Sequence, residues 1–140
     1  MPELACCGND CQACPRYTAT MSEDEARRRE VAARWHRVGW RDHVVSPDEI
    51  ACRGCATATW CRYGIRECAV QRGVDHCGHC HDYPCDNLSR AWEATGAWAR
   101  VCREVCSPEE YARLDRAFFQ KKANLDRANR TFGEEMSPDV

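Results

Sequence analysis

Residues 77–85 read Cys77-Gly-His-Cys80-His-Asp-Tyr-Pro-Cys85 and show the pattern on which the whole chain is built. This stretch contains one of three Cys-x2-Cys pairs, which are Cys11/Cys14, Cys52/Cys55 and Cys77/Cys80. Two residues between paired cysteines let a tight turn bring both sulfurs to one tetrahedral zinc ion, at about 2.3 Å each. Each pair therefore predicts half of a closed zinc site.

Single cysteines flank the pairs, and all of them together make ten candidate metal ligands. The ten are Cys7, Cys11, Cys14, Cys52, Cys55, Cys61, Cys68, Cys77, Cys80 and Cys85. Ten ligands are enough for two four-thiolate sites, so we expect about two zinc ions per chain. The 21 residues between the second and third pairs resemble zinc-ribbon and treble-clef spacing and favour a site closed by those two pairs. The other site would then draw on Cys7, Cys11, Cys14, Cys68 and Cys85.

The composition explains why bound metal is needed. The 140 residues include 13 cysteines but only 18 Leu, Ile, Val and Phe residues, which is a thin apolar core. A net charge of -2 is too small to indicate a disordered chain. Eleven of the cysteines lie in the first 85 residues. Metal binding would supply the folding free energy that apolar burial does not supply there.

The chain shows no signal-peptide pattern and no apolar stretch near the ~18–20 residues of a membrane span, so we expect a cytoplasmic protein. In a reducing cytosol, clustered cysteines indicate metal ligands or reactive thiols more often than disulfides. The odd count of 13 also fits poorly with a closed set of disulfide pairs.

We predict a mainly α fold in which metal staples irregular loops. The cysteine-rich metal-binding body covers residues 1–85, with a ligand-bearing loop over 6–20, one helix near 22–38 opened by Ser22, and short helices after Ser46 and near 65–72. A helical tail over residues 86–130 packs on the body, so that the chain forms a single compact unit. Within this tail, Gly96 weakens the first helix and Ser107 restarts it.

Two alternatives to zinc remain open. The spacing Cys7-x3-Cys11-x2-Cys14-Pro15 is typical of the three thiolates that hold a [4Fe-4S] cluster, which would make this an iron–sulfur redox protein. We favour zinc because closed thiolate sites in small, loop-rich modules are most often zinc. The other alternative is a thiol-based redox enzyme or sensor that uses a spare cysteine such as Cys6 or Cys61.

The sequence carries no catalytic signature such as a Ser-His-Asp order, a Gly-rich phosphate loop or a His-Glu-x-x-His helix, so it favours structural metal sites over an enzyme. The nearly balanced charge does not favour nucleic-acid binding, and the helical tail is a candidate surface for a protein partner. We expect His76, His79 and His81 to point outward and bind nothing. Cys102 and Cys106 fit a helical core.

Four segments carry a family fingerprint. They are Cys7-Gly-Asn-Asp-Cys11-Gln-Ala-Cys14-Pro-Arg-Tyr17, Ile50-Ala-Cys52-Arg-Gly-Cys55, Ile65-Arg-Glu-Cys68-Ala69 and residues 77–85. With residues 117–125 they resemble the bacterial and archaeal family catalogued as domain of unknown function 3795, over about residues 5–128. The resemblance implies a small, cysteine-rich, metal-binding protein and no particular activity. Many members carry a cysteine three residues after the position of Cys61, where this chain has Gly64, which weakens the case for Cys61 as a ligand.

Overall fold

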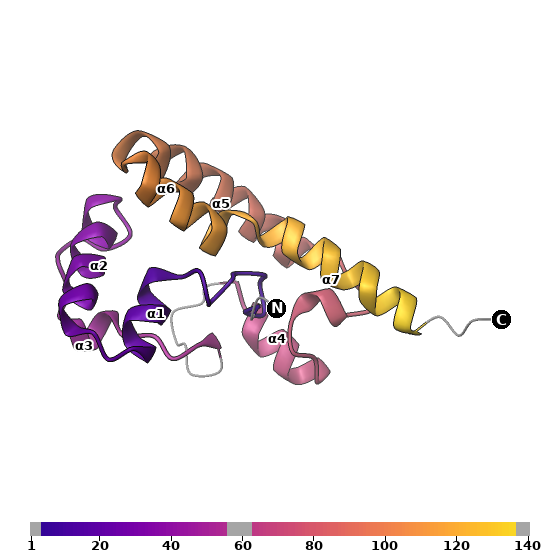
Figure 1. The fold of residues 1–140 in the computed structure, drawn as a ribbon. Coiled ribbons are helices and arrows are strands. Elements are labelled where there is room, and N and C mark those ends of the chain that lie inside the picture. Colours follow the sequence, from indigo (N-terminus) through magenta and orange to yellow (C-terminus); the bar gives the residue numbers. More distant parts are fainter. Residues whose placement is uncertain (1–3, 56–62, 137–140) are drawn as a thin grey trace.

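Helices make up most of this computed structural model, which describes residues 4–55 and 63–136 (Figure 1). In chain order the elements are α1 (Pro15–Met21), α2 (Glu25–Arg37), α3 (Pro47–Ile50), α4 (Ile65–Arg72), η2 (Cys77–His79), α5 (Asp86–Val105), α6 (Pro108–Leu114), η3 (Asp115–Phe119) and α7 (Lys121–Met136). Within these residues the β pairing is limited to one bridge between Leu4 and Asp10. The mainly α class is therefore confirmed. No helix in the described ranges is both long and apolar enough to cross a bilayer.

The predicted loop over residues 6–20 is wrong in its second half, because α1 begins at Pro15. Cys14 caps this helix, and its sulfur accepts a backbone N–H of the first turn at 3.5 Å. Proline suits the first helical position, where its missing N–H leaves no bond unmade. The next helix also starts later than predicted, because Ser22 belongs to the end of α1 and does not open α2. Ser22 ends α1, and Asp24 caps α2 by accepting a backbone N–H at 3.0 Å.

Two clusters of buried side chains form the interior. The α2 core consists of Val31, Ala32, Trp35, Val38, Val45, Ile50, Cys102 and Leu114. The cysteine core consists of Cys6, Ile65, Ala69, Cys77, Leu88, Ala91 and Leu125. Helix α5 contributes to both cores, with Leu88 near its start and Cys102 near its end. The cysteine core holds only three large aliphatic side chains, so the shortage of apolar residues falls in that half of the molecule.

The buried apolar side chains of the C-terminal helices are divided between the two cores. Helix α6 begins after Ser107, as predicted, and Ser107 forms a capping box with Glu110. It is followed by η3, a π-helical turn, before α7 begins. As a result Leu114 packs in the α2 core and Leu125 packs in the cysteine core, and both are fully buried. Helix α7 packs against η2 (Figure 1).

Glu110 also joins α6 to α2. Its carboxylate accepts hydrogen bonds from the backbone N–H of Ser107 at 3.0 Å, from Arg34 at 3.1 Å and from Arg37 at 2.6 Å. The Ser107 N–H is the largest cause, followed by the two arginines, of a pKa for Glu110 that falls from 4.5 to about 2. The ionised carboxylate therefore stabilises the folded protein.

The Glu110→Gln variant is expected to lose about 1 kcal/mol of unfolding free energy at pH 7, because the amide keeps the shape but not the charge. The folded-state pKa of Glu110 lies below its ordinary 4.5, so the wild-type advantage is complete above pH 4.5 and disappears as the pH falls to about 2. Urea unfolding of both proteins across this range measures the difference. A gap of the same size at every pH would contradict the expectation.

Candidate functional site

The cysteines that the structure describes are all thiols. None of these twelve forms a disulfide, and the remaining cysteine, Cys61, lies outside the described residues. Cys102 is buried in the α2 core with Cys106 packed against it, as expected. The other thiols gather around η2, around the cysteine core, and between α1 and α3.

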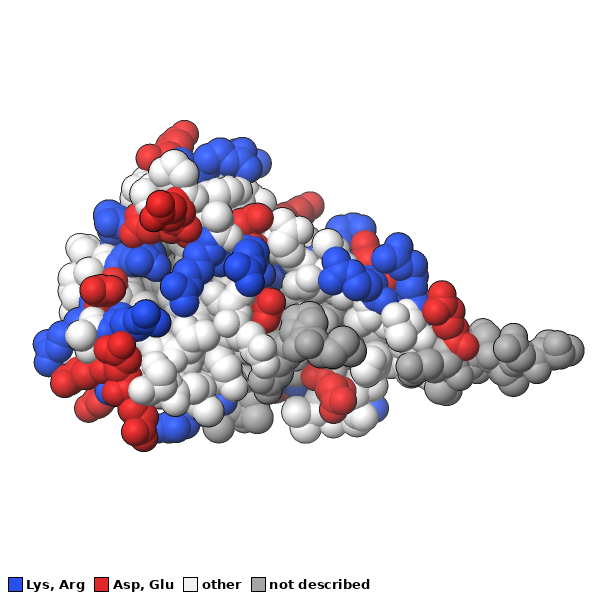
Figure 2. All heavy atoms as spheres, viewed as in Figure 1, with Lys and Arg blue, Asp and Glu red and all other residues white. Residues whose placement is uncertain are grey.

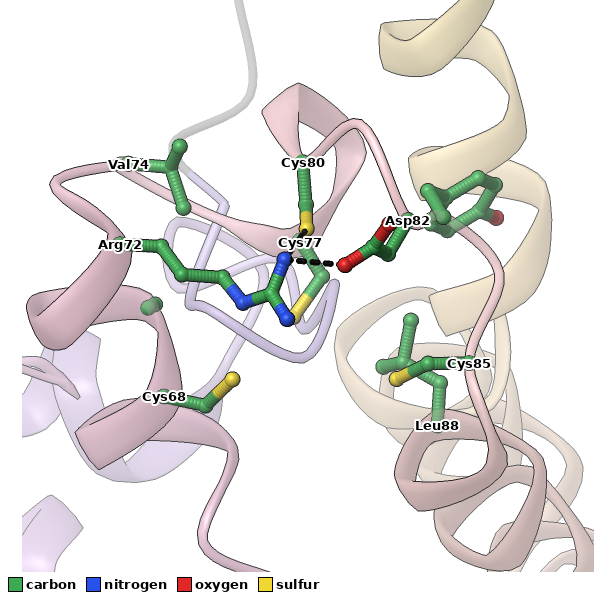
Figure 3. A pocket seen from close by; sticks show the side chains of 10 residues that line it. Cys68, Arg72, Val74, Cys77, Cys80, Asp82, Cys85 and Leu88 are labelled. Atoms are coloured by element: carbon green, nitrogen blue, oxygen red, sulfur yellow. Dashed lines mark hydrogen bonds and ion pairs between the residues drawn. The ribbon is translucent and has the colours of Figure 1, made fainter.

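Four of the predicted ligands line one cavity between α4, η2 and the start of α5 (Figure 3). Cys68 comes from α4, Cys77 and Cys80 from η2 and the residue that ends it, and Cys85 from the N-cap of α5. The cavity has a volume of about 40 Å³. A space of that size holds one ion or about one water molecule.

A tight turn explains why Cys77 and Cys80 lie together. The N–H of Cys80 donates to the carbonyl of Cys77 at 3.0 Å, which closes η2. His76 caps the turn by accepting the N–H of Gly78 at 3.1 Å. From outside, the side-chain amide of Asn129 on α7 donates to the carbonyl of Gly78 at 2.9 Å. The two thiols are therefore held on a turn that α7 braces.

The guanidinium of Arg72 lies among the four thiols (Figure 3). It donates to the sulfur of Cys80 at 3.3 Å and to the carboxylate of Asp82. These partners raise the pKa of Arg72, and Asp82 is the largest cause. A positive charge is thus already present where a set of thiolate ligands would need one.

The pKa of Cys77 shows that the cavity disfavours negatively charged thiolates unless a cation is present. Burial raises the pKa of Cys77 to about 12, and the neighbouring Cys85, Cys7 and Cys68 act in the same direction. Several thiolates in one small cavity therefore need a compensating cation. Among residues 4–55 and 63–136, no three Cys, His, Asp or Glu side chains converge closely enough to hold an ion. Ligation at the cavity would need its side chains to change rotamer.

A second group of thiols lies between α1 and α3. Cys14 and Cys52 are near enough for their charges to interact, and burial raises the pKa of Cys14 to about 11. Cys52 follows α3, and its backbone N–H donates to the hydroxyl of the buried Thr20 at 2.9 Å. The predicted ligand Cys11 precedes α1 in the same Cys-x2-Cys pair as Cys14.

Arg16 supports this second group from within. Its side chain is only 5% exposed, and its guanidinium donates to the carbonyls of residues 49–51. These are the carbonyls that the end of α3 leaves without helical partners, so Arg16 fastens α3 to α1. The positive charge of Arg16 also interacts with Cys14 and Cys52, while burial lowers its pKa.

Three further cysteines lie in or against the cysteine core. Cys55 packs against the core that contains Cys6, and the sulfur of Cys6 donates to the carbonyl of Asp75 at 3.6 Å. The interaction with the Cys6 thiol is the main cause that lowers the pKa of Cys55. Cys7 packs against this core and interacts electrostatically with Cys77. The sequence assigns no ligand role to Cys6, yet it is the partner of a predicted ligand.

This grouping differs from the one that spacing favours. Spacing pairs Cys77 and Cys80 with the cysteines of residues 52–55. In the structure, Cys77 and Cys80 instead share a cavity with Cys68 and Cys85. The physical reason is the placement of α4, which turns Cys68 toward η2. Residue counts contain no information on the direction of a helix inserted between two pairs.

Sequence reasoning also missed the charged side chains around the thiols. Arg72 follows Cys68 by four residues, and such a pair shares one face of a helix, so a signal for it was present. Asp82 lies two residues after Cys80 and had no comparable signal. The burial of Arg16 had none either, since it depends on the placement of α3.

The three histidines near η2 do not line the cavity. The rings of His76 and His79 have centroids 4.1 Å apart. Phe132 on α7 lies 5.2 Å from the ring of His79 and 5.5 Å from the ring of His81. These side chains therefore pack η2 against α7, a contact that the sequence pattern does not predict.

Comparison with known families supports the fingerprint. Residues 3–90 match the family model described as "Protein of unknown function (DUF3795)". No curated protein and no solved structure matches the chain. The matched range contains every cysteine of the cavity and of the group between α1 and α3, and it ends within α5. Because this range is more than half of the 140 residues, the chain belongs to this family of proteins of unknown function.

Proposed function

We propose that the protein binds zinc at structural, cysteine-ligated sites. The observation that carries this proposal is the single cavity lined by Cys68, Cys77, Cys80 and Cys85. Four thiolates are a common ligand set of closed, structural zinc sites. An ion in this cavity would tie α4, η2 and α5 together in the half of the molecule where apolar side chains are fewest.

The positions of Cys7 and Cys14 favour zinc over an iron–sulfur cluster. A [4Fe-4S] cluster needs its cysteine ligands around one centre. The sequence assigns that cluster to Cys7, Cys11 and Cys14. Cys7 packs against the cysteine core, whereas Cys14 belongs to a separate cluster with Ala13. These positions support zinc and leave the iron–sulfur redox protein as the alternative.

We propose the second zinc ion between α1 and α3, with Cys14 and Cys52 as ligands. Their electrostatic interaction supports this, and Cys11 is the natural third ligand because it shares a Cys-x2-Cys turn with Cys14. The buried charge of Arg16 would offset part of the negative charge of these thiolates. Of the other predicted ligands outside the cavity, Cys7 and Cys55 pack against the cysteine core, and Cys61 lies outside the described residues.

Elemental analysis of protein purified anaerobically without added metal tests the proposal. We expect about two zinc ions per chain. The Cys85→Ser variant should retain only one, because it removes a ligand of the cavity and leaves the other group intact. The matched variant Cys106→Ser removes a thiol outside both groups and should retain two. A folded but metal-free protein would contradict the proposal, and iron with labile sulfide would establish the alternative.

Thiol-based redox sensing is a second candidate function, supported by the contact between Cys6 and Cys55. A hydroperoxide would oxidise these two thiols to one disulfide and be reduced to an alcohol and water. Cys55 is the more exposed of the two and would meet the oxidant first. Mass spectrometry of peroxide-treated protein should then show a peptide pair lighter by two hydrogens. A pair that stays reduced would exclude this function.

The protein partner and the cytoplasmic location stay predictions. On the face shown in Figure 2, acidic and basic side chains are interspersed over the described residues. Nucleic-acid binding proteins instead gather their basic side chains into a continuous patch or stripe. This mixed surface supports a function that rests on the thiols and not on a basic footprint.

A further inference from the structure

Arg72 is placed to act on the cavity thiols from the side of α4. It follows Cys68 by one helical turn, and its guanidinium reaches across to the sulfur of Cys80 at 3.3 Å. The side chain of Arg72 is 47% exposed, so it can shift toward solvent without disturbing a packed core. Figure 3 shows the guanidinium between the chain segments that carry the four thiols.

The position of Arg72 matters because a zinc ion bound by the four cavity thiolates would carry a negative net charge. Zinc ligands bind as thiolates, so an ion with four of them carries two net negative charges. A guanidinium beside that centre cancels part of this charge and gives N–H hydrogen bonds to sulfur. The same guanidinium interacts more weakly with neutral thiols, which carry no charge. It therefore stabilises the loaded site more than the empty one.

We propose that Arg72 is a positioning residue of the zinc site, which raises zinc affinity by offsetting the charge of the thiolates and orienting Cys80. This inference rests on the proposed zinc-binding function. Asp82 holds Arg72 in place, since its carboxylate accepts a hydrogen bond from the same guanidinium. Without this partner, a long and half-exposed side chain would spend less time at the cavity.

Zinc affinity, measured by competition with a chromophoric chelator, tests the proposal. The affinity of interest is that of the cavity ion, which is the ion lost in Cys85→Ser. Arg72→Met should weaken binding by about tenfold to a hundredfold, the range for the loss of outer partners of a metal site. Arg72→Lys should lose less, because it keeps the charge but not the planar fork. Asp82→Asn should lose less than Arg72→Met. The exposed control Arg90→Met should match the wild type.

Two further readouts separate this role from a structural one. The effect of Arg72→Met should shrink as the salt concentration rises from about 0.1 to about 1 M, since the interaction is between charges. The cobalt-substituted variant should keep the sulfur-to-metal absorption of the wild type, because its ligands are unchanged. Zinc binding by Arg72→Met that equals or exceeds that of the wild type overturns the proposal, and so does Arg72→Lys binding as weakly as Arg72→Met. A wild-type protein that binds no zinc overturns the proposed function as well.

Discussion

Removal of zinc by a strong chelator is expected to unfold the half of the protein around the cysteine core. That core has Ile65, Leu88 and Leu125 as its large aliphatic side chains, and thiols occupy two of its other positions. Structural zinc contributes about 10–16 kcal/mol of apparent binding free energy in small zinc-binding peptides. Total stabilities of domains are only about 5–15 kcal/mol. Without the ion, the packing of this core is too small to keep α4 and η2 in place.

The α2 core is expected to survive the same treatment. It contains none of the ten predicted ligands, and it encloses Ile50 and Leu114 completely. Trp35 and Trp40 pack edge to face in this core, with ring centroids 4.8 Å apart. Its stability therefore comes from apolar contacts, which a chelator does not change.

Hydrogen exchange with and without chelator measures this difference along the chain. Backbone amides of α4 and η2 should lose their protection when zinc is removed, whereas those of α2 and α6 should keep most of theirs. Uniform loss of protection would show that the two cores unfold as one unit. Unchanged protection in α4 and η2 would show that the cysteine core needs no metal.

Gly8→Ala is expected to destabilise the folded protein by about 3 kcal/mol, through backbone strain and a steric clash. Gly8 has a backbone φ of +98°, a conformation that residues with a side chain rarely adopt. A Cβ atom there would lie 2.6 Å from the carbonyl oxygen of Lys121 and 2.8 Å from Cγ of Leu125. The side chain of Asn124 also donates to the carbonyl of Gly8 at 3.0 Å. The substitution would therefore push the N-terminal loop away from α7.

Urea unfolding of the zinc-loaded proteins measures this effect, with Gly96→Ala as the matched control. Gly96 lies within α5, and a Cβ atom added there would meet nothing outside its own helix within 4 Å. Alanine at this position should therefore stabilise the helix by about 0.5–1 kcal/mol. The two substitutions should thus have opposite signs. A loss below about 1 kcal/mol for Gly8→Ala would mean that the close approach of the loop to α7 does not hold the fold together.

Helices with local signals were predictable from the sequence. Ser46 and Ser107 cap α3 and α6 as their sequence patterns indicate, and α4 covers the predicted residues. The sequence does not predict α1, because the pattern assigns Cys14 only a ligand role. Its sulfur also accepts the capping hydrogen bond of this helix. Pro15 was the available signal. Helix α5 runs through Gly96 without interruption, since its contacts with both cores outweigh the low helix propensity of glycine.

The sequence singles out the four cysteines that line the cavity, but not that these four lie together. Cys-x2-Cys spacing is a local property of a turn, so it identifies Cys77 and Cys80 correctly as neighbours. The approach of Cys68 and Cys85 depends on how α4 and α5 pack, which is a tertiary property. The placement of Leu114 and Leu125 in different cores is also a tertiary property, because the π-helical turn of η3 changes which face of the chain is buried after it.

In the proposed zinc sites, thiolates are the sole ligands of the metal. X-ray absorption at the zinc edge tests it most directly, because it reports the type and distance of the atoms bound to the metal. We expect four sulfur neighbours at about 2.3 Å and no shorter shell. A shell dominated by nitrogen or oxygen at about 2.0–2.1 Å, or protein that contains no zinc at all, would contradict it.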